Sequence, residues 1–215
     1  MAKMNLPNKL TLLRLFSVPV MVVFLLLPAS ILPPVWAYGI GLVLFIATSL
    51  TDMLDGKIAR ARNLITNFGK FMDPVADKFM VIGTLLALLF RMMNPDVYGV
   101  AYDRIFVIVY FAAVVMIIFR ELAITSLRLV LVNASGEVVA ANMLGKIKTV
   151  TQILCICLIF AEPLIIKLIF SFFPEAVYTP FYPVSFLLIV VMLVFTVLSG
   201  ANYIKGGWKH ISTDW

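Results

Sequence analysis

Four aspartates stand at short, regular spacings in the first half of this 215-residue chain, together with small and basic residues. They form two runs, Asp52-x2-Asp55-Gly56-x2-Ala59-Arg60 and Gly69-x3-Asp73-x3-Asp77. On a helix, each run places its aspartates on one face. Ionised carboxylates that converge in a medium of low dielectric repel one another strongly, so this set requires cations.

The residue types around the aspartates indicate which cation would bind. All the candidate ligands are oxygens, with no His or Cys nearby, which favours Mg²⁺ or Mn²⁺, with Ca²⁺ as an alternative, over zinc. A pair of such ions held by carboxylates is suited to binding a diphosphate and stabilising a departing phosphate. Gly56 and Ala59 leave room for a ligand beside the carboxylates, although close helix packing through small residues is an alternative reason for them.

The composition determines what kind of element carries these residues. The chain is 63% hydrophobic and only 13% charged, which excludes a soluble enzyme, a disordered chain and a secreted disulfide scaffold. A membrane-spanning helix needs about 20 apolar residues. We therefore expect an all-α integral membrane protein that forms a single membrane-embedded domain over residues 1–215. Its six transmembrane helices are expected over residues of about 12–32, 35–62, 67–92, 104–133, 142–170 and 182–204.

The N-terminal stretch and the charges give a topology. Residues 5–14 are expected to form a short interfacial helix that places Lys9 and Arg14 among lipid phosphates. With the N-terminus inside, only Arg91, Arg104 and Lys167 of the 17 basic residues lie outside, as the positive-inside rule requires. Both termini and the carboxylate cluster are thus expected on the cytosolic side. The net charge of +6 then suits anionic lipids rather than nucleic acid.

The turn between the second and third spans is short, which predicts that these helices are antiparallel neighbours whose four carboxylates converge. The eight residues of the two runs, with all their spacings, resemble the complete signature of the CDP-alcohol phosphatidyltransferases. Further stretches resemble the branch of that family that makes phosphatidylglycerophosphate in bacteria; they lie at residues 5–14, 120–121, 145–149 and 198–200.

The resemblance implies a CDP-alcohol phosphotransferase fold, a homodimer in the bacterial cell membrane, and transfer of a phosphatidyl group from CDP-diacylglycerol to an alcohol with release of CMP. In the family, the aspartates that match Asp52, Asp55 and Asp73 hold the metals. The one that matches Asp77 is a metal neighbour and the base that deprotonates the acceptor hydroxyl. The matching positions on the CDP side are Gly56, Ala59, Arg60 and Gly69.

Basic residues outside the signature point to an acceptor that carries its own phosphate. Arg120, Lys146 and Arg128 would bind it, although a buried Glu121–Arg128 ion pair is an alternative because these two residues lie on one helix face. Together with the resemblance, this favours glycerol 3-phosphate as acceptor and phosphatidylglycerophosphate as product. Inositol phosphate fits the charge equally well. Phosphatidylglycerol (giving cardiolipin), serine or an amino alcohol are further alternatives, and a cation transporter is a remote one.

Overall fold

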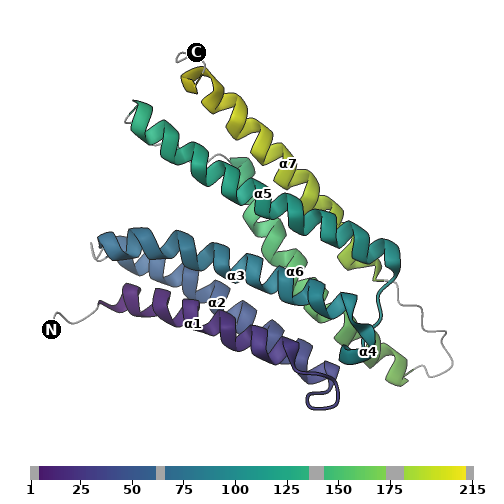
Figure 1. Ribbon diagram of the computed structural model, residues 1–215. Coiled ribbons are helices and arrows are strands. Elements are labelled where there is room, and N and C mark those ends of the chain that lie inside the picture. The colour runs from purple at the N-terminus through teal and green to yellow at the C-terminus, as the bar shows by residue number, and fades with distance from the viewer. Residues whose placement is uncertain (1–4, 62–65, 136–142, 173–181, 212–215) are drawn as a thin grey trace.

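The computed structural model describes residues 5–61, 66–135, 143–172 and 182–211, and this part of the chain is helical without strands (Figure 1). The helices are α1 (Leu6–Leu26), α2 (Pro34–Ala61), α3 (Asn67–Met93), the short α4 (Pro95–Tyr98), α5 (Arg104–Ser135), α6 (Met143–Phe172) and α7 (Pro183–Ile211). The expected all-α membrane architecture is confirmed, and every expected span coincides with a long helix.

Within the described ranges, 5 helices are long and apolar enough to cross a membrane, and α3 is the long helix outside that set. Its first turns carry Asp73, Asp77 and Lys78 among other charges, which lower the apolar content of the helix as a whole. Nevertheless α3 packs against α1 and α5 inside the bundle. Asp73, Asp77 and Lys78 are therefore held by protein neighbours.

The first helix differs from the expectation in both of its ends. The helix is continuous from Leu6, so residues 5–14 do not form a separate interfacial helix. The start is set by Asn5, whose side chain accepts a hydrogen bond from the Asn8 amide at 3.1 Å, and by a proline in the first turn, where no intrahelical donor is needed. The helix ends at Leu26, ahead of the expected boundary, because Pro28 has no amide hydrogen with which to continue it.

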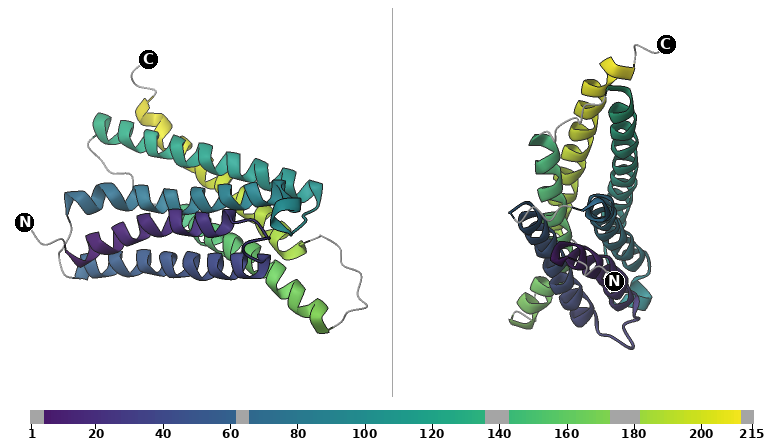
Figure 2. Two further views of the ribbon diagram at one scale, coloured as in Figure 1. Left: turned by 60° about the horizontal axis from the view of Figure 1, so that its bottom comes forward. Right: turned by 90° about the vertical axis from the view of Figure 1, so that its left-hand side faces the viewer.

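The helices form two groups, which are connected by α6 and by the packing of α3 against α5. α1 packs along both α2 and α3, α5 packs along α7, and α6 contacts α2 and α7 (Figure 2). Among the described residues, α2 and α3 contact each other far less than each contacts α1. The side chains of α2 and α3 also meet directly, where the Ser49 hydroxyl donates to the Met80 sulfur at 3.9 Å, and α1 packs along both helices.

One end of the bundle is closed by polar interactions that satisfy its irregular backbone. The buried guanidinium of Arg91 donates to the carbonyl oxygens of Leu25 and Tyr98. It also stacks on the rings of Tyr38 and Tyr98, at 4.9 and 4.7 Å from their centroids, an arrangement that stabilises a desolvated cation. Arg91 thereby ties the ends of α1 and α3 to the short helix α4.

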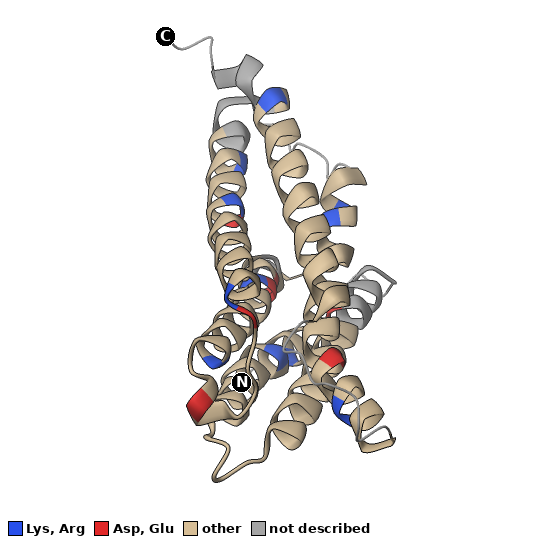
Figure 3. Cartoon of the chain, turned by 90° about the vertical axis from the view of Figure 1, so that its right-hand side faces the viewer, with Lys and Arg blue, Asp and Glu red and all other residues tan. Residues whose placement is uncertain are grey.

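The same end holds the start of α7. The buried carboxylate of Glu162, on α6, accepts hydrogen bonds from the backbone amides of Val184 and Ser185 at 3.1 and 2.8 Å. These amides belong to the first turn of α7, where a carboxylate satisfies unpaired donors and the helix dipole. Long stretches of the helices between the two ends carry no charge (Figure 3). A second group of charged side chains lies toward the other end, where the candidate site is found.

Candidate active site

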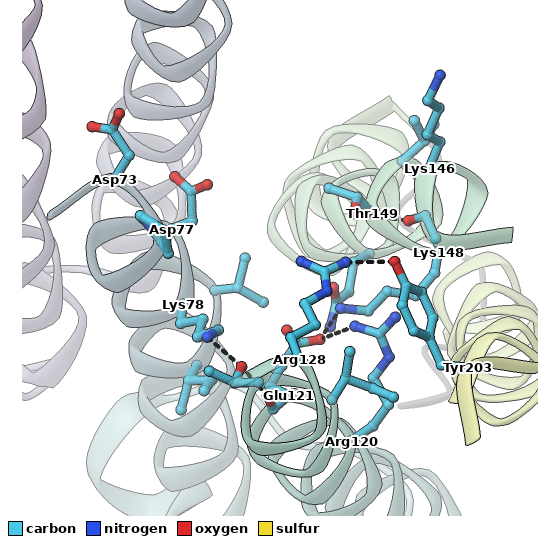
Figure 4. Close-up of a pocket in the computed structure, with 18 residues that line it drawn as sticks. Asp73, Asp77, Lys78, Arg120, Glu121, Arg128, Lys146, Lys148, Thr149 and Tyr203 are labelled. Carbon is cyan, nitrogen blue, oxygen red and sulfur yellow. Dashed lines mark hydrogen bonds and ion pairs between the residues drawn. The ribbon is translucent and has the colours of Figure 1, made fainter. Parts of the chain in front are cut away.

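A cavity of about 620 Å³ opens between α3, α5 and α6, with Tyr203 of α7 at its edge (Figure 4). Charged side chains make up much of its wall. They are Asp73, Asp77, Lys78, Arg120, Glu121, Arg128, Lys146 and Lys148. Asp73 and Asp77 project from the same side of α3, one turn apart, whereas most of the basic residues face them from α5 and α6 (Figure 4). The cavity therefore has an acidic wall and a basic wall.

The acidic wall extends to Asp52 on α2 through a residue of α1. Nη1 of Arg14 lies 2.6 Å from Oδ1 of Asp52 and 2.5 Å from Oδ1 of Asp77. The Arg14 side chain is fully buried, while the two aspartate side chains are 41% and 47% exposed. The expected convergence of the two runs is therefore present for this pair. The expectation that Arg14 lies among lipid phosphates is wrong, because the side chain points into the bundle.

Asp73 of α3 is also held by a side chain of α1. The hydroxyl of Thr11 donates to Oδ1 of Asp73 at 2.6 Å. Neither Thr11 nor Arg14 was placed in the site by the sequence. The available signal was a charge within an otherwise apolar helix, which marks a functional residue, but its position near the N-terminus suggested a lipid contact instead.

Asp55, Gly56, Ala59 and Arg60 belong to helix α2, and their side chains lie outside the described residues. Within the described part of the chain, no three His, Cys, Asp or Glu residues form a group that could hold a metal. The chemistry of the described donors does fit a hard divalent cation, since they are carboxylates. Two carboxylate oxygens that both contact one nitrogen are also close enough together to share a cation.

Gly69 is buried beside the acidic wall rather than in the cavity lining. Its amide donates to the hydroxyl of Thr66 at 3.0 Å, which caps α3. Thr66 in turn donates to the amide oxygen of Asn8 at 2.9 Å. A Cβ at position 69 would lie 3.2 Å from that oxygen and 3.3 Å from the Thr66 hydroxyl. A glycine at this position allows α1 and the start of α3 to approach closely.

The basic wall is held in place by its own contacts. Glu121 pairs with Lys148 and, at 3.0 Å, with Arg120, and Arg120 also donates to the Ser199 hydroxyl at 2.9 Å. Arg128 donates to the Tyr203 hydroxyl at 2.6 Å. Glu121 thus pairs with Lys148 and Arg120. The alternative ion pair between Glu121 and Arg128 is not formed, because Arg128 bonds to Tyr203 on α7 instead.

Lys78 lies between the two walls. It follows Asp77 on α3, and its ammonium group donates to the Thr125 hydroxyl on α5 at 2.5 Å. With Lys78, five cationic side chains line the cavity, against the carboxylates of Asp73, Asp77 and Glu121. Glu121 faces two of the five, so the basic wall retains an excess of positive charge. The arrangement suits a ligand with several phosphate groups, which cationic side chains bind strongly.

Comparison with known proteins agrees with this chemistry. The family model for CDP-alcohol phosphatidyltransferase matches residues 4–198. A CDP-diacylglycerol–glycerol-3-phosphate 3-phosphatidyltransferase of Bacillus subtilis (strain 168) is 39% identical, with 98% of each chain covered. Proteins of the same name are 34% identical in Rickettsia felis, covering 72% of this chain and 74% of the relative, and 30% identical in Pseudomonas fluorescens, covering 98% and 94%.

The packing around Gly69 gives a testable consequence. Gly69→Ala is expected to lower the stability of the protein by about 1 kcal/mol, because the added methyl group displaces the capping contacts of Thr66 and Asn8. Gly39→Ala, on α2, is the matched control, since a Cβ there has no neighbour within 4 Å and alanine favours a helix. Thermal unfolding in detergent measures both. An unchanged Gly69→Ala melting temperature would contradict this packing role.

Proposed function

The chain belongs to the CDP-alcohol phosphatidyltransferase family, and we propose that it transfers the phosphatidyl group of CDP-diacylglycerol to glycerol 3-phosphate, giving phosphatidylglycerophosphate and CMP. The shared name of its full-length relatives supports this reaction. The observation in the structure that carries the proposal is the single cavity in which an acidic wall faces a basic wall. A metal-bound diphosphate and an anionic acceptor can meet there.

We assign the metal site to Asp52, Asp55, Asp73 and Asp77, with two ions of Mg²⁺ or Mn²⁺. The described donors support the assignment, because Asp52 and Asp77 approach one another closely and Asp73 and Asp77 line the cavity. When bound, divalent ions neutralise the diphosphate and stabilise the charge that develops on departing CMP. The CDP side is assigned to Gly56, Ala59, Arg60 and Gly69. In this assignment Gly69 acts through the close approach of α1 and α3.

Asp77 is proposed as the general base. An alcohol is a poor nucleophile at neutral pH, so a base must accept its proton as it attacks. The primary hydroxyl oxygen of glycerol 3-phosphate forms a bond to the phosphorus that bears diacylglycerol, and the bond from that phosphorus to the CMP oxygen breaks. Asp77 accepts the hydroxyl proton. Its side chain is 47% exposed and lines the cavity, which gives the acceptor access to it.

The acceptor phosphate is assigned to Arg120, Lys146 and Arg128, which lie on the wall opposite the aspartates. Lys146 is an exposed residue of the cavity lining, whereas Arg120 is fixed by Glu121 and Ser199. Arg128 is steadied by its hydrogen bond to Tyr203. A phosphate bound there places the acceptor between the two walls, with its hydroxyl toward Asp77.

The described helices support a multi-pass membrane protein. We further propose that both termini and the cavity face the cytosol of a bacterium and that the protein is a homodimer. The distribution of basic residues supports the orientation. The start of α3 and the end of α5, both of which contribute to the cavity, then lie at the level of the cytosolic lipid head groups, where the head group of CDP-diacylglycerol resides.

The first test concerns the metal. Excess EDTA is expected to abolish CMP release from labelled CDP-diacylglycerol, and added Mg²⁺ or Mn²⁺ to restore it, because the carboxylates need cations to bind a diphosphate. Asp52→Asn, Asp55→Asn and Asp73→Asn should each raise the metal concentration needed for half-maximal rate. Full activity in excess EDTA would refute the metal assignment.

The second test concerns the base. Asp77→Asn is expected to lower turnover by roughly 10²–10⁴-fold, the usual contribution of a general base, while CDP-diacylglycerol still binds. Single-turnover rates and equilibrium binding of the donor separate the two effects. If donor binding is lost and the single-turnover rate at saturation is normal, Asp77 is a metal ligand and not the base.

The third test concerns the acceptor. Lys146→Ala and Arg120→Ala are expected to raise the KM for glycerol 3-phosphate by about tenfold or more, as for the loss of a charged hydrogen bond, with little change in the KM for CDP-diacylglycerol. Lys167→Ala is the matched control, since Lys167 is also an exposed lysine of α6 but lies outside this cavity.

Identification of the lipid product completes the acceptor test. Purified protein is given CDP-diacylglycerol with glycerol 3-phosphate, inositol phosphate or phosphatidylglycerol. Phosphatidylglycerophosphate is the expected product. Use of inositol phosphate in place of glycerol 3-phosphate would refute the acceptor assignment and leave the reaction class intact.

A further inference from the structure

One face of α1 is polar and buried although the helix as a whole is apolar. Asn8, Thr11 and Arg14 lie three residues apart, so they follow one another along one side of the helix. Their exposed fractions are 8%, 1% and 1%. Polar and charged side chains are costly inside a membrane protein and are retained where they have partners. The hydrogen-bond and ion-pair partners of these three residues therefore indicate what role they have in the structure.

Two of the three contact aspartates of the acidic wall, and Asn8 contacts the start of α3 beside it. Asn8 accepts a hydrogen bond from Thr66, the capping residue of α3. Thr11 donates to Asp73, and Arg14 contacts both Asp52 and Asp77. The described aspartates of the two runs are thus all held by side chains of α1, the helix that packs against both α2 and α3.

Arg14 contacts the carboxylates from a different side than a ligand in the cavity would. The Arg14 side chain is fully buried, whereas the carboxylates that it contacts are nearly half exposed. Arg14 therefore approaches them from the protein side and leaves their exposed side to a cation or substrate. Groups that hold metal-binding carboxylates from behind fix their orientation and alter the affinity for the metal.

We propose that Thr11 and Arg14 are positioning residues of the catalytic site: Thr11 orients Asp73, and Arg14 orients Asp52 and Asp77 while offsetting one negative charge of the cluster. This inference rests on the proposed metal-binding role of the aspartates. It adds to that role a fixed cation of the protein itself. Arg14 holds the carboxylates in place, and its positive charge weakens their attraction for a divalent ion.

The charge of Arg14 and its positioning role predict opposite outcomes for a variant: removal of the charge tightens metal binding, and loss of positioning slows the reaction. Arg14→Met removes a positive charge close to the ion, so Mn²⁺ is expected to bind about tenfold more tightly. Loss of orientation opposes this gain in Mn²⁺ affinity only in part, because the removed charge lies at contact distance from both carboxylates. It is expected to lower kcat by about 10–100-fold, with the KM for both substrates nearly unchanged. Arg14→Lys should return the Mn²⁺ affinity to the wild-type value and recover part of kcat. A residue that only stabilised the fold would not tighten metal binding when it is removed.

Thr11 carries no charge, so its variants test orientation alone. Thr11→Val removes the hydroxyl at nearly constant shape and is expected to weaken Mn²⁺ binding by about tenfold, whereas Thr11→Ser should bind as the wild type does. Matched controls on the same helix are Lys9→Met, which removes an exposed charge, and Ser17→Ala, whose hydroxyl bonds to the Leu13 carbonyl oxygen of its own helix. Both controls should match the wild type.

Mn²⁺ binding to the purified full-length protein in detergent is measured by electron paramagnetic resonance, beside steady-state kinetics and thermal unfolding. Unchanged or weaker Mn²⁺ binding by folded Arg14→Met would overturn the role of Arg14. If that variant does not fold, the Thr11 pair decides: equal Mn²⁺ affinity of Thr11→Val and Thr11→Ser would overturn the inference. A wild-type protein that binds no Mn²⁺ would instead refute the proposed metal site itself.

Discussion

The mutual repulsion of carboxylates inside a membrane bundle is the constraint around which this structure is organised. Asp52, Asp73 and Asp77 come from two helices that contact each other little among the described residues. What brings them together is α1, through a buried guanidinium and a hydroxyl. Ionised groups of like sign stay close only where positive charge and hydrogen-bond donors compensate them. The position of α1 is therefore as much a part of the site as the aspartates are.

The two ends of the bundle solve the problem of buried polar groups in different ways. At the end that holds α4, Arg91 and Glu162 have backbone partners, so the charge serves the fold and satisfies helix ends. At the other end, side chains pair with side chains and several of them line an open cavity. Arg91 and Glu162 therefore stabilise the fold at one end. The charged side chains at the other end line the cavity and can bind a ligand there.

Separation of charge across the cavity accounts for how one site can handle two anionic substrates. The acidic wall comes from α3, and the basic wall comes mainly from α5 and α6, with hydroxyl partners on α7. Arg120 and Lys148 pair with Glu121 on the basic wall, whereas Asp77 pairs with Arg14 of α1. A diphosphate with its cations and a phosphorylated alcohol can then occupy opposite sides of the same space.

The sequence alone determined the helical membrane architecture, because long apolar segments admit few other structures in a bilayer. It also predicted that the aspartates of the two runs converge, and the structure brings Asp52 and Asp77 together at Arg14 and places Asp73 and Asp77 in the lining of one cavity. Only the tertiary structure decided how those residues are held. Which helix lies beside α2 and α3 depends on packing between segments far apart in the chain, and helical periodicity does not encode it. Hence Arg14 was expected to contact lipid by its place near the N-terminus, and Arg128 was expected either to pair with Glu121 or to bind a phosphate. The position of α1 places Arg14 inside the bundle, and Arg128 bonds to Tyr203 while Glu121 pairs with Arg120 and Lys148.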